Sequence, residues 1–154
     1  MAQRREAREA ALKALYAEEV SKTDVEQILA NIVKPAFQKG DGALKFAESL
    51  FLRVLKNQEE VDEVIRGHIE NWKMERLAII DKVILRMAIC EFLFFEEIPT
   101  KVTMNEAIEL AKRFSTNKSG RFVNGILDSA LGALREEGRI EKSGRGLIET
   151  NTNS

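Results

Sequence analysis

Only two prolines, Pro35 and Pro99, interrupt the 154 residues, and nine glycines leave long stretches without any residue that breaks a helix. Apolar residues recur every three or four positions along these stretches. No segment alternates apolar and polar residues as a half-buried strand would. The pattern therefore predicts an all-α protein, and the length fits one unit of about 150 residues or two small halves that share a core.

The same spacing predicts helices over residues 4–20, 25–34, 43–69, 75–95, 103–114 and 121–137. Asn57 is a candidate break in the third helix. Thr103 and Glu106 resemble a capping box at the start of the fifth helix, and residues 115–120 are predicted to form a polar turn.

The region 75–95 is apolar on most sides, which is typical of a central helix. Trp72 is expected to pack at a joint between two three-helix halves. We expect a helical domain at 1–137 and a flexible tail at 138–154.

Signatures of enzymes are missing from the sequence. It has no glycine-rich phosphate loop, no Gly-x-Ser-x-Gly elbow and no Cys-x-x-Cys pair. His68, the single histidine, lies in a polar stretch typical of a surface or boundary position. Cys90, the single cysteine, lies in the most apolar region and is expected to be a buried, inert thiol. We therefore expect a protein that is not an enzyme and that uses no metal or cofactor.

The cellular location follows from a few features of the chain. The lone cysteine, the charged start Met-Ala-Gln-Arg-Arg-Glu and the lack of an apolar run of about 20 residues predict a cytoplasmic protein with no membrane role.

Charge is distributed unevenly although the net charge is only -1. Basic residues exceed acidic ones by two in residues 1–16 and by three in 101–135, whereas acidic residues exceed basic ones by five in 57–97. Arg5 and Arg8 fall on the side of the first helix that carries Leu12 and Leu15, one to two turns earlier, and their guanidinium groups are expected to reach outward. An RNA backbone would relieve their repulsion with the helix dipole. Pairing with nearby glutamates in an ordinary solvated helix start is the alternative.

Four sequence blocks carry a family resemblance. They read Arg4-Arg5-x-Ala7-Arg8-Glu9-x-Ala11-x-x-Ala14-Leu15-Tyr16, then Asp81-Lys82-x-Ile84-Leu85-Arg86-x-Ala88-x-x-Glu91, then Ile98-Pro99-x-Lys101-Val102-x-x-Asn105-Glu106-Ala107-Ile108-Glu109-Leu110-Ala111-Lys112-x-Phe114, and finally Phe122-Val123-Asn124-Gly125-Ile126-Leu127-Asp128. In order and spacing, to about Leu134, the chain strongly resembles the NusB family of bacterial transcription antitermination factors.

This resemblance implies a fold of two perpendicular three-helix bundles that works without catalysis or cofactor. It further implies a heterodimer with the ribosomal protein NusE, which binds the single-stranded boxA RNA of ribosomal RNA operon leaders. That complex would join the antitermination assembly on RNA polymerase, promote processive transcription past terminators and support ribosomal RNA maturation.

The resemblance also assigns roles to individual residues. It places Arg4, Arg5 and Arg8 on RNA phosphates, and it makes Tyr16 and Phe122 candidates for stacking on bases, with core packing as the alternative. The basic stretch of Lys118 and Arg121 belongs to the same RNA surface. The implied NusE contacts are Glu75, Asp81 and Arg86, although Arg86 could instead form an internal salt bridge.

Two departures and two alternatives complete the sequence interpretation. Lys118-Ser119-Gly120-Arg121 stands where many relatives have an acidic residue followed by Ser-His-Lys, so RNA affinity could be higher and dependence on the partner lower. The tail after Gly138 has no counterpart that the resemblance explains.

Two alternatives to an antitermination factor stay open. One is a helical module that dimerises or binds proteins, and the other is a domain like that of some ribosomal RNA cytosine methyltransferases. The latter needs far more chain than follows Leu134.

Overall fold

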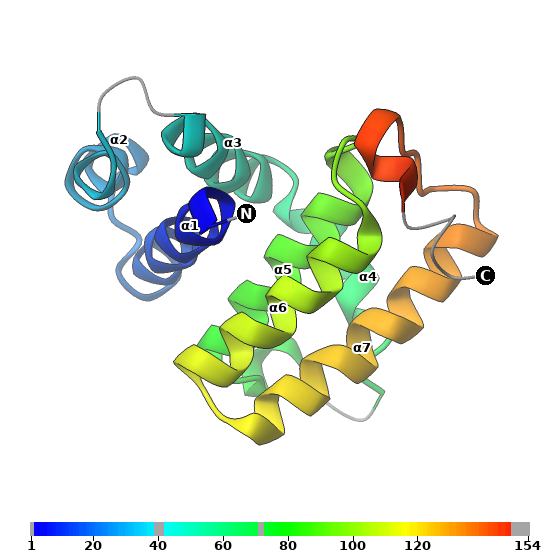
Figure 1. The fold of residues 1–154 in the computed structure, drawn as a ribbon. Coiled ribbons are helices and arrows are strands. Elements are labelled where there is room, and N and C mark those ends of the chain that lie inside the picture. Colours follow the sequence, from blue (N-terminus) through cyan, green and yellow to red (C-terminus); the bar gives the residue numbers. More distant parts are fainter. Residues whose placement is uncertain (1, 39–41, 71–72, 149–154) are drawn as a thin grey trace. The chain divides into compact units, whose positions relative to one another are not determined.

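The computed structural model describes residues 2–38, 42–70 and 73–148. The chain divides into two compact units, Met1–Lys56 and Asn57–Ser154, which are treated separately below. The regular structure in the described ranges is entirely helical (Figure 1), so the all-α prediction is confirmed. The sequence pattern predicts a joint near Trp72, but the boundary between the two units along the chain lies between Lys56 and Asn57. Trp72 itself lies outside the described residues.

The first unit consists of three helical segments. It contains α1 (Ala2–Ser21), a second segment made of α2 (Val25–Ile28), the π-helical η1 (Leu29–Val33) and the 3-10 turn η2 (Lys34–Ala36), and α3 (Gly42–Lys56). The three segments pack around buried apolar side chains, of which the largest that are fully buried are Leu12, Ile28, Leu50 and Phe51. Pro35 sits where the sequence predicts the second segment to stop, and the backbone turns extended at Phe37.

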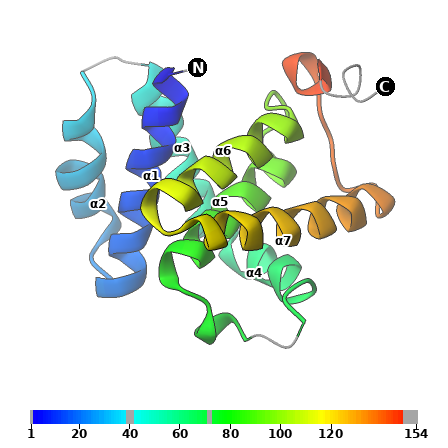
Figure 2. The same ribbon diagram turned by 60° about the horizontal axis from the view of Figure 1, so that its bottom comes forward.

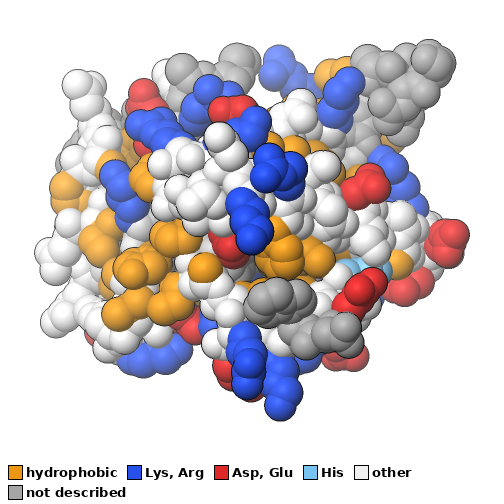
Figure 3. All heavy atoms as spheres, turned by 90° about the horizontal axis from the view of Figure 1, so that it is seen from below, with side chains coloured by type: hydrophobic (Ala, Val, Ile, Leu, Met, Phe, Trp, Pro, Cys, Tyr) orange, Lys and Arg blue, Asp and Glu red, His pale blue; other side chains and the backbone are white. Residues whose placement is uncertain are grey.

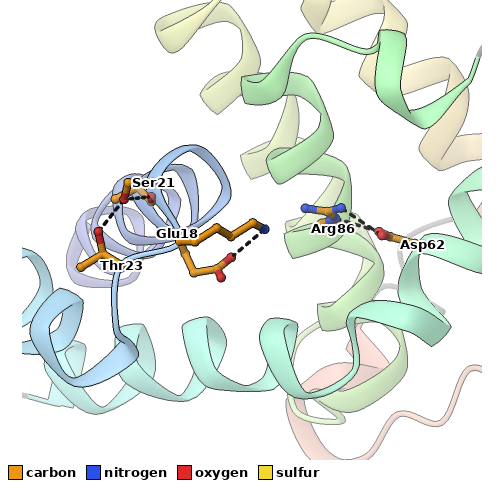
Figure 4. A network of polar contacts seen from close by, with 7 residues as sticks. Glu18, Ser21, Thr23, Asp62 and Arg86 are labelled. Carbon is orange, nitrogen blue, oxygen red and sulfur yellow. Dashed lines mark hydrogen bonds and ion pairs between the residues drawn. The ribbon is translucent and has the colours of Figure 1, made fainter.

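Polar contacts end α1 at the expected place. The Ser21 hydroxyl donates to the carbonyl of Ala17 at 2.7 Å and also lies against the Thr23 hydroxyl (Figure 4). Lys22 adopts a left-handed conformation, with φ of 54°, and its backbone N–H donates to the Glu18 carbonyl. A left-handed residue directly after the last helical turn is a common way to satisfy the final carbonyls of a helix.

The second unit is built around one buried helix. Its elements are α4 (Gln58–Arg66), η3 (Met74–Arg76), α5 (Ile79–Phe94), α6 (Thr100–Phe114), α7 (Asn117–Glu136) and η4 (Gly144–Leu147). α5 packs against α4, α6 and α7 (Figures 1 and 2). Every residue from Asp81 to Phe92 is buried, and Cys90 is fully so. The predictions of a central helix and of a buried thiol are therefore confirmed.

Several predicted boundaries change in the structure. The break at Asn57 is confirmed, because α3 and α4 are separate helices. The capping box at Thr103 is wrong, since α6 already begins at Thr100, and the Thr103 hydroxyl instead donates to the buried Glu91 carboxylate at 2.6 Å. The polar turn at 115–120 is also wrong in its second half. Thr116 caps α7 by accepting the backbone N–H of Ser119 at 2.9 Å, so residues 117–120 form the first turn of that helix.

Residues 142–146 contact the C-terminal end of α5. The Lys142 ammonium donates to the carbonyls of Glu91 and Phe95 at 3.1 and 2.8 Å, and the Ser143 N–H donates to the Glu96 carbonyl at 3.0 Å. Gly146 is buried so close to that same carbonyl that a Cβ atom would overlap its oxygen. These contacts hold residues 142–146 against the segment that follows α5. The predicted mobility of the tail stays a prediction, and residues 149–154 lie outside the described part.

Candidate nucleic-acid interface

The three arginines at the start of α1 lie in three different environments. The guanidinium of Arg4 stacks over the Phe46 ring, 4.5 Å from its centroid, and that of Arg8 lies 5.3 Å from the same centroid. Arg5 is exposed and Arg4 is half-buried, whereas Arg8 is only 3% exposed. The prediction that the Arg8 guanidinium reaches outward is therefore wrong.

The reason lies in the apolar face of α1. Ala7, Ala11 and Leu15 are buried, and position 8 falls on this same face, one turn before Ala11 and Leu12. A planar, weakly hydrated guanidinium tolerates such a site because it can lie on an aromatic ring. Of the three arginines, only Arg5 is exposed.

Tyr16 lies farther along α1 and is 39% exposed. Eleven residues of helix separate it from Arg5, which corresponds to about 17 Å at 1.5 Å per residue. The two side chains therefore leave the helix about three turns apart. Val20, one turn beyond Tyr16 on the same side of α1, is 55% exposed. This exposure leaves Tyr16 available to stack on a ligand.

The first turn of α7 presents a second basic cluster. Lys118 and Arg121 are exposed, and Phe122 is half-buried directly after them. Figure 3 looks onto the side of the molecule that is lowest in Figure 1, where α7 begins, and shows Lys and Arg side chains bordering hydrophobic surface. Cations at a helix N-terminus oppose the helix dipole, so a bound anion would stabilise them.

A pocket of about 250 Å³ opens between the start of α7 and the start of α5. Leu77 and Phe122 contribute apolar walls, Asp81 and Ser119 contribute polar groups, and Lys118 and Arg76 bring exposed cations to it. The Ser119 hydroxyl donates to Asp81 Oδ2 at 3.2 Å. Within the described residues, Asp81 Oδ1 is buried and has no hydrogen-bond partner. Burial raises the pKa of the Asp81 carboxyl, and the hydrogen bond from Ser119 opposes that rise.

The structure groups the predicted site residues differently from the sequence. Asp81, assigned to NusE with Glu75 and Arg86, shares its pocket with Lys118 and Phe122, which were assigned to RNA. Sequence reasoning missed Arg76, Leu77 and Ser119 as members of this pocket. Ser119 stands between two predicted residues, but nothing in the sequence indicates that it bonds to a carboxylate 38 positions away.

Glu75 and Arg86, the two other predicted NusE contacts, differ strongly in solvent exposure. Glu75 is exposed in η3. Arg86 is buried in α5, and its guanidinium forms two hydrogen bonds with the carboxylate of Asp62 on α4 (Figure 4). The internal salt bridge considered for Arg86 is thus observed.

The described ranges offer candidates neither for a metal site nor for a membrane-spanning helix. Those ranges hold no group of three or more His, Cys, Asp or Glu side chains placed to bind a metal ion. None of the described helices has the length and apolar character needed to cross a membrane. His68, half-buried, lies 2.8 Å from the Ser129 hydroxyl through Nδ1, which fits its predicted boundary position.

Comparison with known proteins decides the family. The model of the NusB family matches residues 5–131, which contain all four sequence blocks except Arg4. The chain belongs to the NusB family. The transcription antitermination protein NusB of Salinibacter ruber is 49% identical over 152 residues, covering 99% of this chain and 95% of that protein. NusB of Bacillus mycoides is 43% identical over 131 residues, covering 85% and 98%.

Solved structures agree with this membership. T. maritima NusB superposes with a TM-score of 0.77 at 40% identity, covering 84% of this chain and 90% of that one. A structure of the antitermination factors NusB and NusE in complex with double-stranded RNA gives a TM-score of 0.79 at 25% identity, covering 86% and 98%. The predicted NusB-like fold is therefore confirmed.

Proposed function

We propose that this chain is a transcription antitermination factor that acts without catalysis, by binding single-stranded boxA RNA of ribosomal RNA leaders together with NusE. In this role it would join the antitermination assembly on RNA polymerase in the cytoplasm. Family membership supports the general role, since relatives across most of the chain are named transcription antitermination proteins and a NusB relative is solved with NusE and RNA.

The observation that carries the RNA proposal is the start of α7. Exposed Lys118 and Arg121 stand at a helix N-terminus beside the half-buried ring of Phe122. Single-stranded RNA is generally bound by cations that contact phosphates and by aromatic rings that stack on bases. The exposed Arg5 and Tyr16 of α1 offer the same two chemistries in the first unit.

The NusE contact is proposed for the exposed acidic surface of the second unit. Glu75 is the predicted residue best placed for it, because its side chain is exposed on η3. Arg86 would act on NusE indirectly, by holding α5 against α4 through Asp62. Charge complementarity of this kind mainly raises the association rate and the specificity of a complex.

Fluorescence anisotropy tests the proposal. Labelled boxA RNA and a scrambled RNA of equal composition would be titrated with the protein alone and with its cognate NusE, at two salt concentrations. We expect selective binding of boxA that NusE strengthens. Equal, salt-sensitive binding of both RNAs without a NusE effect would contradict the proposal. It would favour the alternative of a helical interaction or dimerisation module, for which light scattering would then show a homodimer.

A further inference from the structure

The aliphatic part of Lys112, at the end of α6, crosses the first turn of α7. Gly120 is buried in that turn, and a Cβ atom at this position would lie 3.0 Å from Cγ and 3.4 Å from Cε of Lys112. Because a 3.0 Å approach is tighter than ordinary packing, a side chain at position 120 would push Lys112 aside. The bare backbone of Gly120 therefore lets the aliphatic part of Lys112 lie on α7.

This placement leaves the Lys112 ammonium group available to a ligand. The side chain is exposed, and Nζ is one bond beyond Cε, which keeps it within about 5 Å of the position that a Cβ atom of Gly120 would take. In the described part of the chain, the ammonium forms no hydrogen bond or ion pair. The guanidinium of Arg113, by contrast, lies over the Phe114 ring, 5.5 Å from its centroid. Of the two cations that end α6, Lys112 is therefore the one held over α7 and ready to bind an anion.

Lys112 extends the basic cluster of α7 around the helix. At about 100° per residue, Arg121 lies about 100° around α7 from Gly120, and Lys118 lies about 160° around in the same direction. The Phe122 ring follows at about 200°. Lys112, which covers Gly120, therefore stands at one end of an arc of side chains that passes Arg121 and Lys118 and ends at an aromatic ring.

This arc carries no negative charge of its own. Residues 110–127 contain four Lys or Arg residues and no Asp or Glu. The exposed amides of Asn117 and Asn124, which can donate hydrogen bonds, fall between the cations of the arc. Ser119, to which Asp81 is bonded, lies off the arc on the other side of the helix. A row of cations that ends at an aromatic ring fits an extended anion with flat rings, which describes single-stranded nucleic acid.

We propose that Lys112 binds a phosphate of single-stranded RNA and that Gly120 positions it to do so. The inference rests on the proposed function and adds a path to it. A strand with a base stacked on Phe122 passes Lys118 and Arg121 and then reaches Lys112 on the α6 side of α7. Lys112 is not among the residues that the sequence predicts to bind RNA, because its placement depends on a contact with another helix.

The salt dependence of RNA binding tests the contact. Labelled boxA RNA and the scrambled RNA would be titrated by anisotropy with the protein and its cognate NusE at several salt concentrations. Lys112→Met keeps the aliphatic part over Gly120 and removes the charge. We expect the slope of log K against log salt to drop by about 0.7 for both RNAs, because a phosphate contact reads no sequence. The loss of affinity should then be about fivefold larger at a tenth of a given salt concentration.

Two further lysine variants show whether the effect belongs to the charge at this position. Lys112→Arg retains a cation and should keep the slope of the parent protein. Lys101→Met removes an exposed cation from the other end of α6, about 17 Å away along the helix, and is the matched control. The parent slope in Lys112→Met, or an equal drop in Lys101→Met, would overturn the inference.

Glycine variants test the positioning by Gly120. Gly120→Leu fills the space that Lys112 crosses, so it should lower the slope as Lys112→Met does, and the double variant should show no further drop. Gly132→Leu, at a position of α7 with open space around it, is the control and should keep the parent slope. Slope changes that add in the double variant would overturn the role of Gly120. If circular dichroism shows that Gly120→Leu does not fold, Lys112→Met and Lys112→Arg decide the inference.

The same titrations separate this inference from the proposed function. If both RNAs bind equally and Lys112→Met lowers the slope, the proposal of boxA recognition fails and the Lys112 contact stands. If boxA is preferred and Lys112→Met leaves the slope unchanged, the proposed function stands and the inference is overturned. Absence of binding to either RNA would overturn both.

Discussion

The guanidinium of Arg86 and the carboxylate of Asp62 form a two-pronged ion pair inside the second unit. Nε lies 2.7 Å from Oδ1, and Nη2 lies 2.9 Å from Oδ2. The two side chains are only 8% and 10% exposed. Parallel N–H donors matched to both carboxylate oxygens fix the orientation of each group, so the pair sets how α4 lies against α5.

Removing one member of this pair should destabilise the second unit strongly. Asp62→Asn takes the Asp62 carboxylate charge away from the buried Arg86 guanidinium, and we expect the free energy of unfolding to fall by about 3–5 kcal/mol. Urea denaturation at pH 7 measures the loss. Glu63→Gln, an exposed carboxylate on the same helix, is the matched control and should change stability by less than about 0.5 kcal/mol. Equal, small effects of both substitutions would contradict this account.

The raised pKa of Asp81 predicts a pH effect on stability. Because its pKa in the folded protein lies above the ordinary value of 3.8, the folded state holds this proton more tightly than the unfolded state. The stabilisation is complete below pH 3.8 and is lost as pH rises through the folded pKa. Asp81→Asn, which has no such proton, should therefore gain stability relative to the parent protein as pH increases from 4 to 7.

Thermal unfolding across that pH range measures the effect of Asp81→Asn. Ser119→Ala removes the hydrogen bond that opposes the shift, so it should raise the pKa of Asp81 further and extend the loss of stability to higher pH. A constant difference in melting temperature between Asp81→Asn and the parent at every pH would show that Asp81 titrates normally.

The two arginines Arg5 and Arg8 should separate into different roles. Arg5→Ala removes an exposed cation, and if Arg5 contacts a phosphate, the slope of log K against log salt for single-stranded RNA should drop by about 0.7. Arg8→Ala removes a guanidinium that lies over Phe46, and we expect a loss of about 0.5–2 kcal/mol in stability. Anisotropy titrations and urea denaturation on both variants distinguish the effects. An unchanged salt slope for Arg5→Ala would exclude that residue from the RNA site.

The C-terminal segment should depend on Lys142. Lys142→Met removes two hydrogen bonds to the end of α5, and Gly146→Ala forces a Cβ atom against the Glu96 carbonyl. Both should speed hydrogen exchange at the Ser143 amide, which donates to that carbonyl, while amides in the middle of α5 stay protected. Arg145→Met, an exposed cation of the same segment, is the control. Fast exchange at Ser143 already in the parent protein would show that the segment is mobile, as its composition predicts.

Much of the fold was predictable because helical periodicity is a local property. The apolar spacing from Leu77 to Phe94 predicted the buried helix α5, and Asn57 marked the division between α3 and α4. Thr103 shows where local patterns fail, because its hydroxyl serves a buried carboxylate twelve positions earlier and not a helix start.

The candidate site was less predictable for the same reason. The basic residues could be found from the sequence, but whether each faces solvent depends on a ring contributed by another helix, as Phe46 does for Arg8. The grouping of Asp81 with Ser119 depends on how α5 and α7 pack. Periodicity within one helix carries no information about such a pairing.

Burial on every side of α5 constrains how this protein can change over evolution. A helix with one solvent face can acquire a new contact by a single exposed substitution, but the stretch from Asp81 to Phe92 offers no such face. A substitution in this stretch first changes the packing of the buried side chains. New binding specificity in this unit must therefore arise at the helix ends and in the short connections, where a substitution at an exposed position such as Lys118 alters the surface and leaves the interior unchanged.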